Sequence, residues 1–382
     1  MDNQGFGLEL ARWQGLLDQG PFAHTAKTTR GCLNDRDTHV LPGSIGTEAE
    51  LAEVLTQPRP ALVESIGGLA SPLVLLGAGG KLGPTLAVLA RRAAEAAGHP
   101  LEVIAVSRFT DGDTRQWLAA HGIRTLVCDL LAPGAASALP DSQNVVYLVG
   151  LKFGTHQSPQ RTWAINTVAP AVAAQRYPQA KLVVLSTGNV YPLTPVSRGG
   201  SVETDPLTPV GEYANATVGR ERIFEFYAER NGTPLVLLRL NYAVELRYGV
   251  LVDVARKVQA GEPVEVTQGY FNCIWQGDVN EVVLRAFGLA SPPPVVLNLT
   301  GPEVLSVRQV AQRFGELLGK PARIAGLEAA TALLSNPARA CALFGPPPTP
   351  LDMVMRWIAD WLAAGRPVWD RPTHFEVRDG AY

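Results

Sequence analysis

Six short runs of consecutive apolar residues recur between positions 73 and 240, and helix-like stretches separate them. The runs are LVLL at 73–76, VIAV at 103–106, TLVC at 125–128, VVYLV at 145–149, LVVLS at 182–186 and LVLLRL at 235–240. Runs that are apolar at every position, and not only at alternate ones, are typical of strands covered on both faces. Their alternation with helices predicts an α/β protein with a Rossmann-type, doubly wound parallel sheet.

The regular alternation fades after Asn241, where mixed helices and short strands predict a smaller C-terminal α/β lobe that covers a substrate. Its last amphipathic helix is expected from about Leu351 to Ala364. Near the other end, Thr47 precedes Glu48 and Glu50, which predicts a short helix because a hydroxyl caps its start and acids favour its positive end. The proline-rich stretches 291–296 and 345–350 predict loops.

These patterns divide the chain into four expected parts. We expect an irregular arm at 1–45, a helical lead-in at 46–70, a Rossmann domain at 71–240 to which 271–290 return, and a substrate lobe with the C-terminal tail at 241–270 and 291–382.

Composition and charge restrict the partners. With 46% hydrophobic and 18% charged residues in 382, the chain is too apolar for a disordered protein. A formal net charge of −2 and the absence of a basic stripe argue against a nucleic-acid partner. The four cysteines are far apart and the histidines are scattered, so we expect a reducing compartment and no metal. No apolar stretch is long enough for a bilayer, and we expect a cytoplasmic protein without a membrane partner.

A glycine-rich segment connects the first apolar run to a helix expected from Pro84 to Ala97. It reads Gly77-Ala78-Gly79-Gly80-Lys81-Leu82-Gly83. Glycines allow the backbone to turn tightly and to approach a pyrophosphate at the helix N-terminus, so the segment predicts dinucleotide binding in preference to an ordinary turn. The GxxGxxG spacing of Gly77, Gly80 and Gly83 resembles the extended short-chain dehydrogenase/reductase superfamily, the NAD-dependent epimerase/dehydratase family.

The end of the second strand bears on the choice of cofactor. Ser107 and Arg108 follow Val106 where NAD-preferring folds place an acid, and an arginine there accommodates a 2′-phosphate. We therefore predict NADP, with NAD as the alternative, and expect Lys81 to add a second positive charge near Arg108. The resemblance further implies that Asp129 and Leu130 meet the adenine and that Asn166 belongs to the cofactor-binding set.

The fifth apolar run leads into Ser186-Thr187-Gly188-Asn189-Val190-Tyr191, which resembles the SSxxVYG segment of the same superfamily. The resemblance implies that the Thr187 hydroxyl binds the reacting substrate oxygen. It also implies a catalytic tyrosine about one loop later, for which Tyr213 fits. Packing of Tyr213 in the core is the alternative reading.

The family pattern YxxxK is broken, because the fourth residue after Tyr213 is Thr217. A phenol has a pKa of about 10, and the lysine normally lowers it with a nearby positive charge. Two substitutes are expected. Arg220 lies two helical turns after Tyr213, and Lys152 follows the fourth strand in a Gly-Leu-Lys segment similar to one in the epimerases. Without the lysine, the reductive direction should suffer least, and oxidation should need alkaline pH.

Two further departures concern the substrate. Gly188 and Asn189 replace the Asp-Glu pair of the sugar-nucleotide dehydratases, which argues against that elimination. The stretch 270–278 lacks the arginine that grips a diphosphate in the nucleotide-sugar enzymes. Its aromatic and amide side chains suit a neutral polyol or sugar face, although Phe271 and Trp275 equally fit a core. The expected substrate-binding residues are Thr187, Asn189, Tyr191, Asn241 and Trp275.

Three arginines, at 239, 247 and 256, are left to bind a carboxylate, so a sugar acid is a further possibility. We therefore predict an NAD(P)-dependent reductase or keto-intermediate epimerase acting on a sugar-derived small molecule. A non-catalytic NADP-binding sensor or scaffold is the alternative. The family resemblance also implies a homodimer formed through helices near 160–177 and 212–230.

Overall fold

The computed structural model describes residues 41–110, 112–155 and 157–381. The expected arm at 1–45 therefore lies outside the described residues, except for 41–45. The sheet expected from the apolar runs is present and has seven parallel strands in the order β12-β7-β5-β4-β1-β2-β3. Its strands are β1 (Leu73–Leu76), β2 (Val103–Ser107), β3 (Arg124–Val127), β4 (Asn144–Tyr147), β5 (Lys181–Thr187), β7 (Leu235–Leu240) and β12 (Val295–Leu299).

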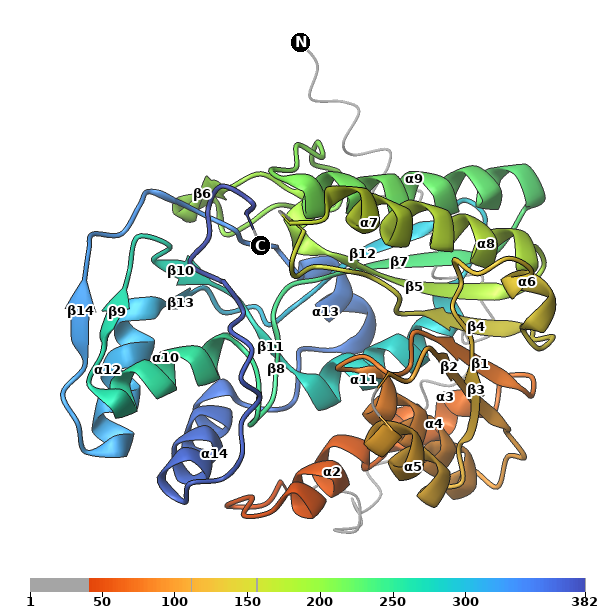
Figure 1. Ribbon diagram of the computed structural model, residues 1–382. Coiled ribbons are helices and arrows are strands. Elements are labelled where there is room, and N and C mark those ends of the chain that lie inside the picture. The colour runs from red at the N-terminus through yellow and green to blue at the C-terminus, as the bar shows by residue number, and fades with distance from the viewer. Residues whose placement is uncertain (1–40, 111, 156, 382) are drawn as a thin grey trace, which may run out of the picture. The chain divides into compact units, whose positions relative to one another are not determined.

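Helices cover both faces of this sheet, which explains why its strands are apolar at every position (Figure 1). In β1, Leu73 and Leu75 pack into one hydrophobic cluster, while Val74 and Leu76 pack into another. The first cluster lies under α3 (Pro60–Ile66), α4 (Gly83–Ala96) and α11 (Gln276–Arg285), and α5 (Gly112–Ala120) packs beside α4. The other face carries α6 (Ala135–Ala138), α7 (Pro159–Trp163), α8 (Ala169–Arg176) and α9 (Glu212–Asn231), with a π-helical turn at Ala164–Val168.

A third hydrophobic cluster forms the smaller lobe. It is built on α2 (Glu48–Thr56), α10 (Val250–Ala260), α12 (Val307–Leu318) and α14 (Leu351–Ala363). Short strand pairs border it: β8 (Ala243–Val244) with β11 (Ile274–Trp275), β9 (Pro263–Glu265) with β14 (Arg323–Ala325), and β10 (Tyr270–Phe271) with β13 (Leu305–Ser306). The remaining described elements are β6 (Thr194–Pro195), β15 (Thr331–Ala332), α13 (Ala338–Phe344) and three 3-10 turns at Gly188–Val190, Val196–Arg198 and Ala286–Leu289.

One expected boundary needs correction. β12 begins at Val295, inside the segment expected to be a loop, and completes the Rossmann sheet beside β7. The stretch 291–382 therefore does not belong wholly to the substrate lobe. In the lead-in, Thr47 caps α2 as expected, because its hydroxyl accepts a hydrogen bond from the Glu50 amide at 3.1 Å. Leu51 and Leu55 of α2 pack into the cluster of the smaller lobe, and this helix also contacts α4 and α11, against which α3 packs.

Among the helices of the described ranges, none combines the length and apolar character that a membrane crossing requires. Within the same ranges, no three His, Cys, Asp or Glu side chains cluster as metal ligands.

Candidate active site

The glycine turn joins β1 to α4 at the carboxyl end of the sheet. Gly77 has φ +87°, and a Cβ there would lie 2.8 Å from the Val149 amide nitrogen in the loop after β4. Gly83, the first residue of α4, packs its Cα against the Ala78 backbone, where a Cβ would collide. Both positions therefore require glycine, and the resulting cradle of backbone amides at a helix start fits a pyrophosphate.

A pocket of about 300 Å³ opens on one side of this turn, at the ends of β1 to β4. The expected cofactor residues Gly79, Ser107, Arg108, Asp129 and Leu130 line it together with Gly77 and Gly80. Arg108 is exposed, and Asp129 accepts a hydrogen bond from the Leu131 amide at 3.0 Å. In the described part of the chain, Ser107 to Thr110 at the end of β2 carry no acidic side chain, and the acid in this lining is Asp129 after β3.

The expectation that Lys81 lies near Arg108 is wrong. The Lys81 ammonium donates a 2.5 Å hydrogen bond to the Ala243 carbonyl and lies 4.5 Å from the centre of the Tyr248 ring. It lines a second pocket on the other side of the glycine turn, toward the smaller lobe. Burial lowers the pKa of Lys81 to about 8, although Glu245 and Asp253 oppose that shift.

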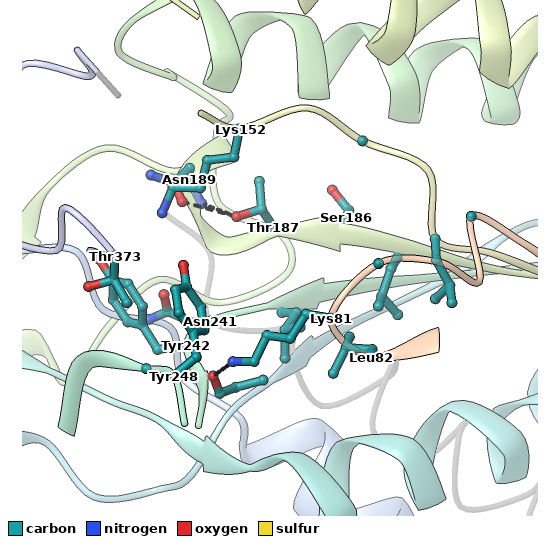
Figure 2. A pocket seen from close by; sticks show the side chains of 18 of the residues that line it. Lys81, Leu82, Lys152, Ser186, Thr187, Asn189, Asn241, Tyr242, Tyr248 and Thr373 are labelled. Carbon is teal, nitrogen blue, oxygen red and sulfur yellow. Dashed lines mark hydrogen bonds between the residues drawn. The ribbon is translucent and has the colours of Figure 1, made fainter. Parts of the chain in front are cut away.

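The second pocket has a volume of about 310 Å³ and brings most of the expected reactive residues together. It shares Gly77, Gly80, Leu148 and Gly150 with the first pocket, so a dinucleotide can reach from one into the other. Its expected members are Lys81, Leu82, Gly83, Lys152, Thr187, Asn189, Tyr213 and Asn241. Figure 2 shows Lys152, Thr187 and Asn189 on one side of this pocket and Lys81 with Asn241 on the other.

Thr187 ends β5 and begins the next turn. Its hydroxyl donates to the Asn189 side-chain oxygen at 3.0 Å and accepts from the Asn189 amide at 3.2 Å. Ser186, just before it, donates to the carboxylate of Glu221 on α9, which a fully buried ion pair with Arg239 holds in place. These contacts fix the end of β5 against α9, the helix that carries Tyr213 in its first turn.

Lys152 brings a positive charge into the pocket from the loop after β4. Burial lowers the pKa of its ammonium to about 8, and the carboxylate of Asp253 opposes the shift. The ammonium lies 5.7 Å from the centre of the Tyr242 ring. Among the described residues that line this pocket, none is acidic and none is an arginine.

Arg220 does not replace the missing lysine in the pocket. It is 4% exposed, and its guanidinium donates to the Leu185 carbonyl at 2.9 Å and to the Asn166 side chain. Asn166 is fully buried and in turn donates a hydrogen bond to the Leu151 carbonyl at 3.0 Å. It lines neither pocket, so the expected contact of Asn166 with the cofactor is not borne out. The two side chains instead hold the loop after β4, next to Lys152.

Two expected substrate residues are also corrected. Tyr191 is 2% exposed and its hydroxyl donates to Asn298 at 2.8 Å while accepting from Arg239. Trp275 is 1% exposed, and its ring centre lies 5.5 Å from that of Trp357 in the smaller lobe. Neither lines the pocket. The arginines expected to await a carboxylate form ion pairs: Arg239 with Glu221, Arg247 with Glu245 and Arg256 with Asp370.

Tyr242, Tyr248 and Thr373 bring hydroxyl groups to this pocket and were not among the expected site residues. Tyr242 and Tyr248 come from the segment that joins β7 to α10, and Thr373 comes from the C-terminal tail. Tyr242 directly follows Asn241, an expected substrate residue, so its position in the chain was an available signal. The segment Thr373–Asp379 is dense in polar side chains for a tail, and this pattern is compatible with a return over the cleft as well as with a structural anchor.

Comparisons with known proteins bear on the family and the fold of the chain. A family model described as NAD dependent epimerase/dehydratase family matches residues 73–273, more than half of the chain. Among solved structures, UDP-glucose 4-epimerase of Thermus thermophilus with NAD is 19% identical (TM-score 0.63), covering 76% of this chain and 98% of that one. UDP-glucuronic acid 4-epimerase of Bacillus cereus with NAD is 16% identical (TM-score 0.65), with coverages of 76% and 98%. UDP-glucose 4-epimerase of Thermotoga maritima with UDP-glucose is 16% identical (TM-score 0.63), with coverages of 77% and 99%. No curated protein sequence matches the chain.

Proposed function

Because the chain belongs to the NAD dependent epimerase/dehydratase family, we propose that it oxidises or reduces a small carbohydrate-like molecule, as a reductase or a keto-intermediate epimerase. A bound nicotinamide dinucleotide would accept or donate the hydride. One observation carries the proposal: Thr187, Tyr213 and Lys152 line one pocket that adjoins the glycine turn.

In this proposal each side chain has a separate task. Tyr213 donates a proton to the reacting oxygen in reduction and accepts it in oxidation. The Thr187 hydroxyl, whose single proton is donated to the Asn189 side chain at 3.0 Å, would orient that oxygen by turning this proton toward it when the substrate binds. Lys152 supplies the positive charge that Thr217 lacks. A tyrosine with less electrostatic help remains a competent acid, so reduction is the favoured direction at neutral pH.

The pocket's size and lining support a substrate without a nucleotide. Its volume of about 310 Å³ is at the lower end of the range of ligand pockets, about 300–1,000 Å³. The nicotinamide would share this space. Hydroxyl and amide side chains of Thr187, Asn189, Asn241, Tyr248 and Thr373 line it, and no described arginine lies there to bind a diphosphate. These features favour a polyol or keto-sugar. The ammonium groups of Lys81 and Lys152 would also suit the carboxylate of a sugar acid.

The cofactor preference is also part of the proposal. Arg108 at the end of β2 favours NADP, because it lines the pocket next to Ser107 and puts a positive charge where NAD-preferring folds carry an acid. The family's name refers to NAD, so NAD is the alternative that direct binding measurements must separate.

Exposed apolar side chains on α7, on the adjoining π-helical turn and on α9 support the homodimer expected through the helices near 160–177 and 212–230. Trp163 of α7 is 40% exposed, Val168 in the adjoining π-helical turn is 50% exposed, and Phe226 of α9 is 55% exposed. Apolar side chains on the outer surface of α7, the π-helical turn and α9 are suited to contact a second copy. A Phe226→Glu protein should sediment as a monomer, whereas unchanged sedimentation would remove this part of the proposal.

The function is tested by mass spectrometry of the dinucleotide that co-purifies with the protein, followed by a panel of ketoses, polyols and sugar acids. We expect turnover of one or more panel members, with a loss of at least about a hundredfold in Tyr213→Phe. Release of oxidised cofactor would identify a reductase, and a retained cofactor would identify an epimerase. A Tyr213→Phe protein equal to the wild type would instead support a non-catalytic NADP sensor or scaffold.

A further inference from the structure

The last residues of the chain return to the site of the proposed chemistry. After α14 the chain runs without helix or strand from the smaller lobe to the end of the sheet, where Figure 1 marks the C-terminus. We call Thr373–Ala381 the C-terminal strap. It touches three parts of the candidate active site: the pocket wall, the start of α9 and the loop that carries Lys152.

The strap is anchored on the smaller lobe. Phe375 is 1% exposed, with its ring centre 6.1 Å from that of Phe271 in β10. Glu376 pairs with Lys257 of α10 at 2.5 Å. Arg378 donates to the Gln268 side chain at 2.6 Å and to the Thr331 hydroxyl at 2.8 Å. The strap therefore has a defined path and ends in a defined place.

Thr373, at the beginning of the strap, forms part of the pocket wall. Both its amide and its hydroxyl donate to one oxygen of Asp253 in the first turn of α10, at 2.8 Å and 2.5 Å. Asp253 is also the carboxylate that opposes the lowered pKa of Lys152. One acidic side chain thus both fixes the strap and acts on the pocket lysine.

The other end of the strap meets the helix that carries Tyr213. Gly380 (φ +76°) and Gly211 (φ +86°) pack backbone against backbone, and a Cβ on either would collide with the other's main chain or its neighbour's. Gly211 is the residue immediately before α9, and Tyr213 is the second residue of that helix. Between the two ends, the His374 ring lies 6.0 Å from that of Phe153, the neighbour of Lys152.

We propose that the C-terminal strap is a positioning element of the active site, which holds the first turn of α9 through the Gly380–Gly211 contact and closes the substrate side of the pocket with Thr373. This inference rests on the proposed function, because it assigns the strap a role in placing Tyr213. A displacement of about 1 Å at a reacting group can cost about a hundredfold in rate, so a contact two residues from Tyr213 is close enough to matter.

The structure offers a matched pair of variants. Gly380 and Gly365 both have positive φ, at +76° and +64°, so Ala at either carries the same kind of backbone strain. Only at Gly380 would the new Cβ meet the Val210 carbonyl and the Gly211 Cα, whereas nothing lies within 4 Å of it at Gly365. Hydrogen–deuterium exchange of the first turn of α9 should accelerate several-fold in Gly380→Ala and stay unchanged in Gly365→Ala.

Turnover of the panel compound that the wild type converts fastest should fall about a hundredfold in kcat for Gly380→Ala, with little change in Kd for the dinucleotide. Thr373→Val, which keeps the side-chain volume and loses the hydroxyl donor to Asp253, should mainly raise KM. If Gly380→Ala does not fold, a chain ending at Arg378 removes the same contact. Exchange in α9 that matches the Gly365→Ala control, in whichever of the two variants folds, overturns the proposal.

Different results would refute the proposed role of Tyr213 and the proposed role of the C-terminal strap. A Tyr213→Phe protein with wild-type turnover removes the proposed function of Tyr213, whatever the exchange data show. Loss of activity in Tyr213→Phe together with unchanged kcat and unchanged exchange in Gly380→Ala removes the strap's role alone.

Discussion

The hydroxyl of Thr217 donates a 2.9 Å hydrogen bond to the backbone carbonyl of Tyr213, one turn earlier in α9. Thr217 is fully buried, so its one polar side-chain atom is committed to the helix and carries no charge to the pocket. Position 217, where the YxxxK pattern has a lysine, therefore places no positive charge beside Tyr213. Any replacement must come from another element, and Lys152 after β4 is the cation that lines the pocket beside Thr187 and Asn189.

Removing the Lys152 charge should therefore impair the reaction more than cofactor binding. We expect Lys152→Met to lower turnover by about tenfold to a hundredfold, because a positive charge in the pocket that Tyr213 also lines favours the developing phenolate. Lys152→Arg should retain more activity, since it keeps the charge. Lys181→Met is the matched control, because Lys181 is exposed at the start of β5. Equal turnover in the 152 and 181 Met variants would show that Lys152 has no part in the chemistry.

The buried lysines also predict how stability depends on pH. Burial lowers the pKa of Lys152 from 10.5 to about 8. Between these values the unfolded chain binds the proton more tightly, so the free energy of unfolding rises with pH through this window, by at most about 1.4 kcal/mol per pH unit. Below pH 8 both states are protonated and the folded state keeps the full cost of the buried charge.

Denaturant unfolding of the wild type and of Lys152→Met checks this dependence. The stability advantage of Lys152→Met should be greatest at pH 7 and should shrink as the pH rises toward 10.5. Lys181→Met, whose ammonium is exposed, should show no such trend. An advantage that stays constant or grows with pH would contradict the assignment of a buried, destabilised cation.

Replacing Arg108 should change the affinity for NADP much more than the affinity for NAD. If its guanidinium binds a 2′-phosphate, Arg108→Ala should weaken NADP binding by about tenfold to a hundredfold, the usual value of hydrogen bonds to a charged group. NAD affinity should stay nearly constant, because NAD has no charge at that position. Fluorescence titration of both reduced dinucleotides measures the ratio. Tighter binding of NAD than NADP by the wild type would refute the NADP preference.

The central sheet could be predicted from sequence because its signal is local. Strands covered on both faces are continuous apolar runs, and β1 and β7 lie at the predicted positions, 73–76 and 235–240. β12 was missed because three prolines precede it and its pairing with β7 joins residues far apart in the chain. The residues of the segment 291–299 do not by themselves indicate that β12 pairs with β7.

The site shows the same division between local and distant information. Residues on the glycine turn, after β4, at the end of β5 and at the start of α9 line the two pockets as expected, because parallel strands bring their carboxyl ends to one edge. Lys81 was placed in the wrong pocket because its side-chain direction depends on Ala243 and Tyr248 of the smaller lobe. Thr373 was missed for a related reason, since its place depends on Asp253, 120 residues earlier.

The glycine turn itself can be tested with a second matched pair. Gly77 (φ +87°) and Gly98 (φ +64°) both favour glycine, so Ala at either should cost about 1–2 kcal/mol from backbone strain alone. At Gly98 a Cβ meets nothing within 4 Å, but at Gly77 it would lie 2.8 Å from the Val149 amide nitrogen. Because Val149 leads into the Gly150 loop shared by both pockets, Gly77→Ala should lose measurable dinucleotide binding and unfold more easily than Gly98→Ala. Titration with NADPH and thermal unfolding of the two variants compare them directly. Similar cofactor affinity in both would mean that the close approach of the turn to the loop after β4 is not what forms the dinucleotide site.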